Sequence, residues 1–282
     1  MAEGAMTPNP LTILDWKSSA SGFVGAEMLL QLGGYYGTTH YFDTDALAWL
    51  PQDGRRPTQG AIVNIRPDKC RVLVSLTQAD LETALGRFHE CLDVFLWLVD
   101  KGFAKLPERE EYRVGERQFP SVTYIIQHVI AKPGLLDWSY GIGVEAGLRA
   151  PELGWTPPEV AEALAVKAEL DAKRLKKTDP AAQPWVKLRD ALTTAGYGPT
   201  AKRDAAATTG TSWHKTILFF LRGMKVDLTT APPDQVGMLT HFERWSTHVG
   251  LEPKQLETKV ANVDFGWAGT WDCLGMCNLE GG

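Results

Sequence analysis

The sequence has few cysteines and no long apolar segment. Its 282 residues include four cysteines, and no two of them form a Cys-x-x-Cys pair. This usage gives no sign of a disulfide scaffold and favours a reducing cytoplasm. The longest apolar runs, such as Ile217 to Leu221, are too short to span a bilayer, and the N-terminus lacks the pattern of a signal peptide. We therefore expect a cytoplasmic protein without a membrane partner.

The chain also lacks an excess of positive charge. Its formal net charge is −5, while 44% hydrophobic and 22% charged residues are ordinary for a globular protein. A generally basic coat for nucleic acid is thereby excluded, although a local path of Lys and Arg is not. Candidates for such a path, each of which can equally be a solvated surface group, are Arg55, Arg56, Lys173 to Lys177, Lys202, Arg203 and Lys215.

Two apolar runs, one near each end of the chain, deliver charged side chains. The first is Leu11 to Lys17, with Asp15 and Lys17, and the second leads from Phe265 to Asp272. Side chains alternate between the two faces of a strand, so Asp15 and Lys17 share one face. A metal-dependent phosphodiesterase needs two acids for a divalent cation and a lysine beside the attacked phosphate.

The acid-x-Lys spacing is not specific, because it occurs four times. The copy that begins at Asp171 is typical of a solvated helical face, and the copy that begins at Glu252 spans a proline typical of a turn. The copy that begins at Glu257 is interpreted as an ordinary charged strand face leading toward Asp272. Each motif alone carries a false-positive risk.

Four motifs together resemble the RecB-type branch of the PD-(D/E)XK nuclease superfamily, which includes small phage exonucleases. They are Gly-x-x-x-His, Gly-x-x-Asp, Asp-x-Lys and Gln-x-x-x-Tyr, matched by Gly210 to His214, Gly269 to Asp272, Asp15 to Lys17 and Gln31 to Tyr35. The sequence that begins at Phe119 resembles the first segment of proteins in that family. The sequence that begins at Gly60 resembles the strand after their Gln/Tyr helix. The resemblance covers most of the chain and is weakest in the middle helices.

The resemblance implies a restriction-endonuclease-like α/β fold, a mixed sheet flanked by helices. It assigns catalytic roles to five residues, Asp15, Lys17, Asp272, Gln31 and Tyr35. It assigns Mg²⁺ or Mn²⁺ to the ligands His214, Asp272 and Asp15, and an imidazole ligand tilts the preference toward Mn²⁺. Without the family pattern, His214 between apolar neighbours is typical of a packed core histidine. Four-cysteine iron–sulfur clusters occur in some relatives, but the cysteine spacing here predicts none.

The order of the motifs departs from the family. The chain begins at Asp-x-Lys, so it resembles a circular permutation whose termini lie between the two metal-binding strands. Residues 1–107 would form the second half of the nuclease core, from the Asp-x-Lys strand to a closing helix. Residues 108–202 would form the opening helical segment, and residues 203–282 the first half of the core, with the His helix and the Gly-x-x-Asp strand. Both chain ends are rich in Gly or Pro, where a cut is well tolerated.

The expected function is metal-dependent DNA hydrolysis, most simply by an exonuclease in phage-type recombination or processing. Its partners would be DNA and a recombination or single-strand-binding protein, in the host cytoplasm if a phage encodes it. One alternative is a catalytically silent DNA-binding or assembly module that keeps the nuclease fold. Another is an oligomer in which two chains exchange halves, although tethering at an effective concentration on the order of millimolar favours closure within one chain.

Hydrophobic periodicity and turn signals predict the remaining elements. A hairpin turning at Pro67 is expected between residues 61–65 and 71–76, and Thr77 with Asp80 can cap the helix that follows. Strands are expected around Glu257 and Asp272. Further helices are expected over residues 27–36, 121–130, 135–148, 158–176, 185–195, 203–222 and 233–249.

Overall fold

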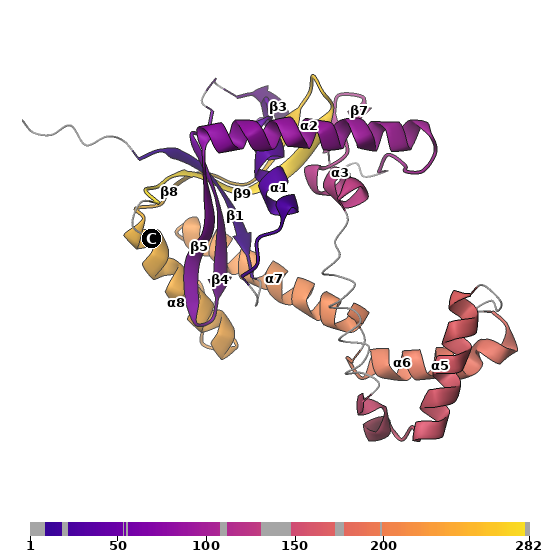
Figure 1. The fold of residues 1–282 in the computed structure, drawn as a ribbon. Coiled ribbons are helices and arrows are strands. Elements are labelled where there is room, and N and C mark those ends of the chain that lie inside the picture. Colours follow the sequence, from indigo (N-terminus) through magenta and orange to yellow (C-terminus); the bar gives the residue numbers. More distant parts are fainter. Residues whose placement is uncertain are drawn as a thin grey trace, which may run out of the picture. The chain divides into compact units, whose positions relative to one another are not determined.

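The computed structural model describes residues 9–18, 22–52, 54, 56–107, 112–130, 148–172, 178–197 and 199–279 (Figure 1). The chain divides into two compact units. The first unit combines residues 1–131 with 212–282, and the second comprises residues 132–211. Residues 112–130, which were expected in the opening helical segment, cluster with the first unit.

The first unit is built on a mixed seven-stranded sheet within the described residues. Its strands are, in spatial order, β3 (Ala48–Pro51), β2 (His40–Asp43), β8 (Glu252–Asn262), β9 (Trp267–Met276), β1 (Leu11–Lys17), β4 (Gln59–Arg66) and β5 (Lys69–Thr77). β1 and β4 are parallel, and the other neighbouring strands are antiparallel. The prediction of an α/β fold with a mixed sheet is confirmed.

β1 and β9 lie side by side, although one stands near the start of the chain and the other near its end (Figure 1). Their antiparallel register runs from Leu11 opposite Met276 to Leu14 opposite Cys273. The expected pairing of the two carboxylate-bearing strands is therefore confirmed. Most of the two end segments that were expected to correspond to their connection, residues 1–10 and 279–282, lies outside the described residues.

Helices cover both faces of the sheet (Figure 1). Three helices pack on one face, α1 (Ala26–Tyr36), α2 (Gln78–Asp100) and α3 (Val122–Val129). The other face packs against α8 (Pro233–His248) and the part of α7 (Pro199–Leu221) that belongs to the first unit. The strand period explains this arrangement, because Ile13 belongs to the first core and Leu14 and Trp16 belong to the second.

Glycines allow α1 to pack closely on its neighbours, which explains a helix with two adjacent glycines. A Cβ atom on Gly33 would lie 2.4 Å from the backbone carbonyl carbon of Ala84 in α2. A Cβ atom on Gly34 would lie 2.9 Å from a methyl group of Val122 in α3. These two glycines lower the helix propensity of α1, but they allow it to lie in close contact with α2 and α3.

Local signals in the sequence are reproduced around α2. β4 and β5 form the expected hairpin, with Arg66 paired to Lys69 around the turn. Thr77 and Asp80 form both hydrogen bonds of a capping box at the start of α2. In the loop before α3, β6 (Arg113–Val114) and β7 (Arg117–Gln118) form a short hairpin.

The second unit is helical in its described part. It contains α5 (Pro157–Asp171), α6 (Gln183–Thr194), the start of α7 and two short 3₁₀ segments, Ala150–Leu153 and Pro180–Ala182. A small core joins α5, α6 and the segment Ala150–Leu153, with Ala150, Ala163, Leu188 and Leu192 buried in it. The predicted helix over residues 135–148 lies almost wholly outside the described residues.

The helices and the cysteines bear on what the composition predicted. Within the described part of the chain, no helix combines the length and the apolar character needed to cross a membrane. All four cysteines are free thiols, and three of them are buried, Cys91, Cys273 and Cys277. Cys273 and Cys277 pack in the core beneath α8, as expected of core residues.

Candidate metal centre

The site forms where β1 and β9 cease to pair. The last pair in register is Leu14 and Cys273, and Asp15 and Asp272 are the next residue of each strand. The backbone N–H of Trp16 donates a hydrogen bond of 2.6 Å to Asp272 Oδ2. This bond, made in place of a ladder contact, holds the Asp272 carboxylate against the end of β1.

On the β1 side, the two charged residues of the Asp-x-Lys motif form an ion pair. Lys17 Nζ lies 2.7 Å from Asp15 Oδ2, and only 4% of the Asp15 side chain is exposed. Gln31 of α1 contacts both groups, since its Nε2 lies 3.4 Å from Asp15 Oδ1 and its Oε1 lies 3.5 Å from Lys17 Nζ. Gln31 Nε2 also donates to the hydroxyl of Tyr35 at 2.8 Å. Four predicted site residues are thus brought into one network.

The glycine of the Gly-x-x-Asp motif makes room for this network. A Cβ atom on Gly269 would lie 2.6 Å from Cε1 of Tyr35. The Tyr35 ring therefore packs directly on the β9 backbone, three residues before Asp272. Any larger side chain at this position would displace the ring and, through it, Gln31.

On the other side of the site, Asp272 gathers with two further residues. His214 Nδ1 lies 3.8 Å from Asp272 Oδ1 and 3.9 Å from Glu257 Oε1. One ligand atom from each of the three residues lies within 4.8 Å of the other two. Ligands about 2.1 Å from a common ion are roughly 3 to 4 Å apart, so small side-chain rotations suffice to close the group on a divalent cation.

Glu257 is the site residue that the sequence interpretation missed. Its neighbours Leu256 and Thr258 pair with Cys273 and Trp271, so Glu257 stands opposite Asp272. A signal for this position existed, because counting outward from the turn between Asn262 and Trp267 leads to the same pairing. Glu257 therefore belongs to the cluster with Asp272 and is not part of an ordinary charged strand face.

The backbone of Glu257 is also unusual. Its φ is +47°, in the left-handed region that a residue with a side chain rarely adopts. Such a conformation costs on the order of 1 kcal/mol and persists only where the surrounding structure imposes it. Here it lies in the middle of β8, beside the carboxylate of Asp272, where it interrupts the regular ladder.

The electrostatics of Asp272 differ from those of an ordinary aspartate. Burial and, next in size, the negative charge of Asp15 raise the pKa of Asp272 from 3.8 to about 7. His214 and the N–H of Trp16 oppose this rise, and Glu257 adds to it. A carboxyl with this pKa is a group whose charge is incompletely compensated by the protein itself.

The basic and phenolic groups respond to the same acids. Burial alone would lower the pKa of His214, but the nearby carboxylates of Glu257 and Asp272 outweigh it and raise that pKa. Burial opposes the charge of Lys17 as well, yet contact with Asp15 leaves the pKa of Lys17 raised. Burial and the charge of Asp15 raise the pKa of Tyr35 well above its ordinary value. At neutral pH, Lys17 is therefore charged and Tyr35 is neutral.

The six predicted site residues are thus distributed between two adjoining groups. His214 and Asp272 join Glu257, while Asp15, Lys17, Gln31 and Tyr35 form the neighbouring network. Comparisons with family models, with curated proteins and with solved structures found no match to the chain. The interpretation of the site therefore depends on its own geometry and chemistry.

Proposed function

We propose that the protein is a divalent-metal-dependent deoxyribonuclease. The observation that carries the proposal is the junction of β1 and β9, where Asp272, His214 and Glu257 converge beside the Asp15–Lys17 pair. This arrangement supplies oxygen and nitrogen donors for a cation and, next to them, a fixed ammonium group. A phosphodiester is the substrate that uses both, because its hydrolysis builds negative charge on phosphate oxygens.

Three residues would hold the cation, namely Asp272, His214 and Glu257. The carboxylate of Asp15 is near enough to act on the charges of Asp272 and His214. A bound Mg²⁺ or Mn²⁺ would supply a water of lowered pKa and a Lewis acid for the phosphate. The imidazole of His214 favours Mn²⁺, since Mg²⁺ prefers oxygen ligands alone. Asp272 would lose its proton when the cation binds, which removes the cost of its buried charge.

Lys17 would act as a fixed positive charge. Its raised pKa keeps the ammonium protonated at neutral pH, so it is unsuited to accept a proton from water. It can instead donate to the attacking water or to a phosphate oxygen as charge develops there. Asp15 and Gln31 position Lys17, through the contacts of 2.7 Å and 3.5 Å described above.

Gln31 and Tyr35 would orient the lysine and contact the substrate. The Gln31 amide donates to Tyr35, so the hydroxyl hydrogen of Tyr35 stays available for a phosphate oxygen. Because the phenol is neutral, it can approach the phosphate without repulsion. The motif resemblance extends the proposal. It implies exonuclease action, a role in phage-type recombination and a circularly permuted nuclease core.

The test is a digestion assay on linear single- and double-stranded DNA with Mg²⁺, with Mn²⁺ and with EDTA. We expect cutting only with a divalent cation, and a loss on the order of 10³-fold in Asp272→Asn, a change that keeps the shape of the side chain. Asp68→Asn, in the exposed turn between β4 and β5, is the matched control. Equal cutting by Asp272→Asn and the parent would contradict the proposal. Retention of DNA without cutting would instead identify a silent binding module.

A further inference from the structure

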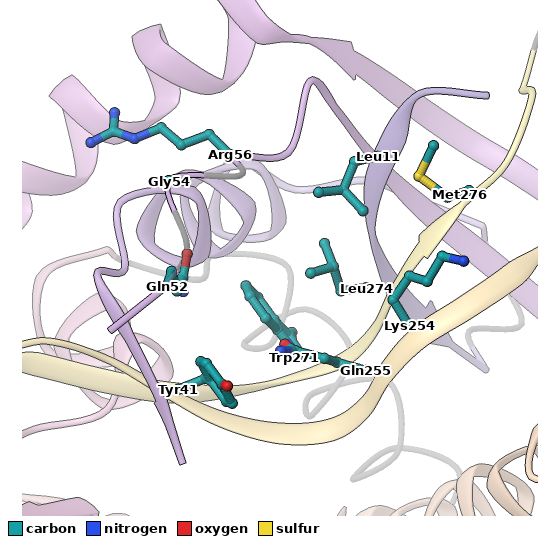
Figure 2. Close-up of a pocket in the computed structure, with 10 residues that line it drawn as sticks. All are labelled: Leu11, Tyr41, Gln52, Gly54, Arg56, Lys254, Gln255, Trp271, Leu274 and Met276. Carbon is teal, nitrogen blue, oxygen red and sulfur yellow. The ribbon is translucent and has the colours of Figure 1, made fainter. Parts of the chain in front are cut away.

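A cavity of about 590 Å³ lies on the sheet (Figure 2). Its lining comes from β1, β2, β8 and β9 and from the chain that follows β3. Leu11 and Met276, which are paired in register, lie at the end of β1 opposite to Asp15. The volume lies within the range of pockets that bind small molecules. None of the lining residues belongs to the metal cluster or to the Lys17 network.

Two polar atoms of the lining residues are buried without a hydrogen-bond partner among the described residues. They are Nε1 of Trp271, in β9, and Oε1 of Gln255, in β8. The Trp271 side chain is nearly inaccessible, at 1% exposure. An unsatisfied buried donor or acceptor costs about 1–3 kcal/mol. Both atoms are inaccessible in the unliganded protein, so a ligand with an acceptor and a donor on one edge would satisfy them once the side chains around them move.

The walls around these atoms are apolar or aromatic. Figure 2 shows the Trp271 ring between Leu274 on one side and Gln52 and Tyr41 on the other. Flat apolar walls suit a planar ring, which gains contact area and stacking there. An aliphatic ligand would also fill the space, but it would leave the polar atoms of Trp271 and Gln255 unsatisfied.

A cation stands beside the cavity at Lys254. Its side chain is half exposed, and its Nζ lies 3.4 Å from Glu252 in a solvated ion pair of the weak kind. The other basic lining residue, Arg56, directs its guanidinium away from the cavity in Figure 2 and lies over the ring of Tyr36. The Lys254 ammonium also points away from Trp271 and Tyr41 in Figure 2, but its half-exposed side chain has room to turn toward an anionic substituent on the ligand.

We propose that this cavity binds a single nucleotide. The base enters between Trp271 and Tyr41, accepts from the indole N–H and donates to Gln255 Oε1. The phosphate then lies at the rim, where the ammonium group of Lys254 neutralises it. That this nucleotide is one unit of a DNA strand rests on the proposed function, whereas the binding of a free nucleotide does not.

The experiment is calorimetric titration of the full chain, in EDTA, with the four deoxynucleoside 5′-monophosphates, the corresponding deoxynucleosides and inorganic phosphate. We expect the monophosphates to bind, the deoxynucleosides to bind about tenfold more weakly, and inorganic phosphate to give no measurable heat. Absence of binding by all four monophosphates would overturn the proposal. Equal binding of monophosphate and deoxynucleoside would remove Lys254 from the site.

Three variants test the assigned contacts. Lys254→Gln should weaken monophosphate binding about tenfold and leave deoxynucleoside binding unchanged. Gln255→Leu and Trp271→Phe should each weaken both ligands by about fivefold to tenfold, as expected for loss of one hydrogen bond. Lys69→Gln is the matched control, because Lys69 lies on β5 at the opposite edge of the sheet and also faces an acid, at 3.8 Å. Unchanged binding in all three pocket variants would contradict the assignment.

Nuclease activity and nucleotide binding in the cavity can be tested independently of each other. Asp272→Asn removes a residue of the metal cluster that does not line the cavity, so its nucleotide affinity in EDTA should equal that of the parent. Metal-dependent cutting without nucleotide binding in EDTA would overturn the cavity assignment alone. Nucleotide binding by a chain that never cuts DNA would leave the cavity assignment standing and overturn the nuclease.

Discussion

The two carboxylates at the junction of β1 and β9 have opposite surroundings. Asp15 lies 2.7 Å from the ammonium of Lys17 and accepts a contact from the Gln31 amide. Asp272 has the N–H of Trp16 and a histidine near it, but also a second acid, and its pKa is raised to about 7. The negative charge of Asp15 is compensated by the protein, whereas that of Asp272 is left for a cation to compensate. In the proposed mechanism, Asp15 therefore positions Lys17, and Asp272 binds the metal, within one site.

The largest effect that sharpens this comparison is expected from Lys17→Met. Loss of the ammonium should lower the rate of DNA cutting by about 10² to 10³-fold, because charge on the phosphate is no longer stabilised. Affinity for Mn²⁺ should be retained, since Lys17 is not a ligand. Cutting rates and Mn²⁺ titrations measured on the same preparations check both statements, with Lys69→Met as control. Loss of Mn²⁺ binding in Lys17→Met would contradict the assignment of Lys17 to a network separate from the metal ligands.

Conservative substitution of the two acids should change stability in opposite directions. Asp15→Asn leaves the largely buried ammonium of Lys17 without its partner, at a cost of about 2 kcal/mol. Asp272→Asn removes a buried and incompletely compensated charge, so the metal-free variant should gain about 2 kcal/mol at pH 8. Thermal unfolding in EDTA should show midpoint shifts of about 5 °C with opposite signs. Shifts of the same sign would show that the acids are equivalent.

The stability of the metal-free protein should fall as the pH rises. The pKa of Asp272 is 3.8 in an unfolded chain and about 7 in the fold, so between these values the folded state holds the extra proton. Stability from this group is present at pH 4 and is lost as the pH passes through 7. His214, whose pKa is also raised, acts in the same direction above pH 6.5.

Urea unfolding at pH 5, 6, 7 and 8 measures this dependence. Mn²⁺ should restore stability most at pH 8, where the ligands are deprotonated without competition. Asp272→Asn should show a flatter profile in EDTA. A parent protein whose stability rises steadily from pH 5 to pH 8 would contradict the assignment of the raised pKa to Asp272.

A smaller effect is expected from glycine substitutions. Gly269→Ala places a methyl group against the Tyr35 ring, so we expect a loss of about 1–3 kcal/mol and a cutting rate lowered about tenfold. Gly86→Ala is the control, because Gly86 is helical and a Cβ atom there meets nothing within 4 Å. That change should stabilise the protein by about 0.5–1 kcal/mol. Equal stability of both variants would mean that Tyr35 is not packed on β9.

Local patterns in the sequence were sufficient for much of the sheet. The apolar run ending at Lys17 predicted β1, and the hairpin at Pro67 and the cap at Thr77 follow from turn and capping chemistry over a few residues. The pairing of β1 with β9 was inferred from motif chemistry, because the strand pattern itself carries no information about partners 250 residues away. Roles for the site residues remain predictions.

Features that depend on register or on several distant segments were harder to predict. Glu257 was taken as an ordinary strand face, although its place opposite Asp272 follows from the length of the β8–β9 hairpin. Its positive φ has no signal in the sequence, because left-handed backbone is normally indicated by glycine or asparagine. The cavity was not predicted at all, because Trp271 and Lys254 meet Leu11 only through the order of four strands.

The metal centre is tested most directly by the binding of a cation at the junction of β1 and β9. Calorimetric titration with Mn²⁺ at pH 8 should show a site in the parent protein, and Glu257→Gln and Asp272→Asn should each weaken it at least about tenfold. Asp68→Asn, which changes an acid of the β4–β5 turn, should bind as the parent does. Identical Mn²⁺ binding by all four proteins would contradict the account.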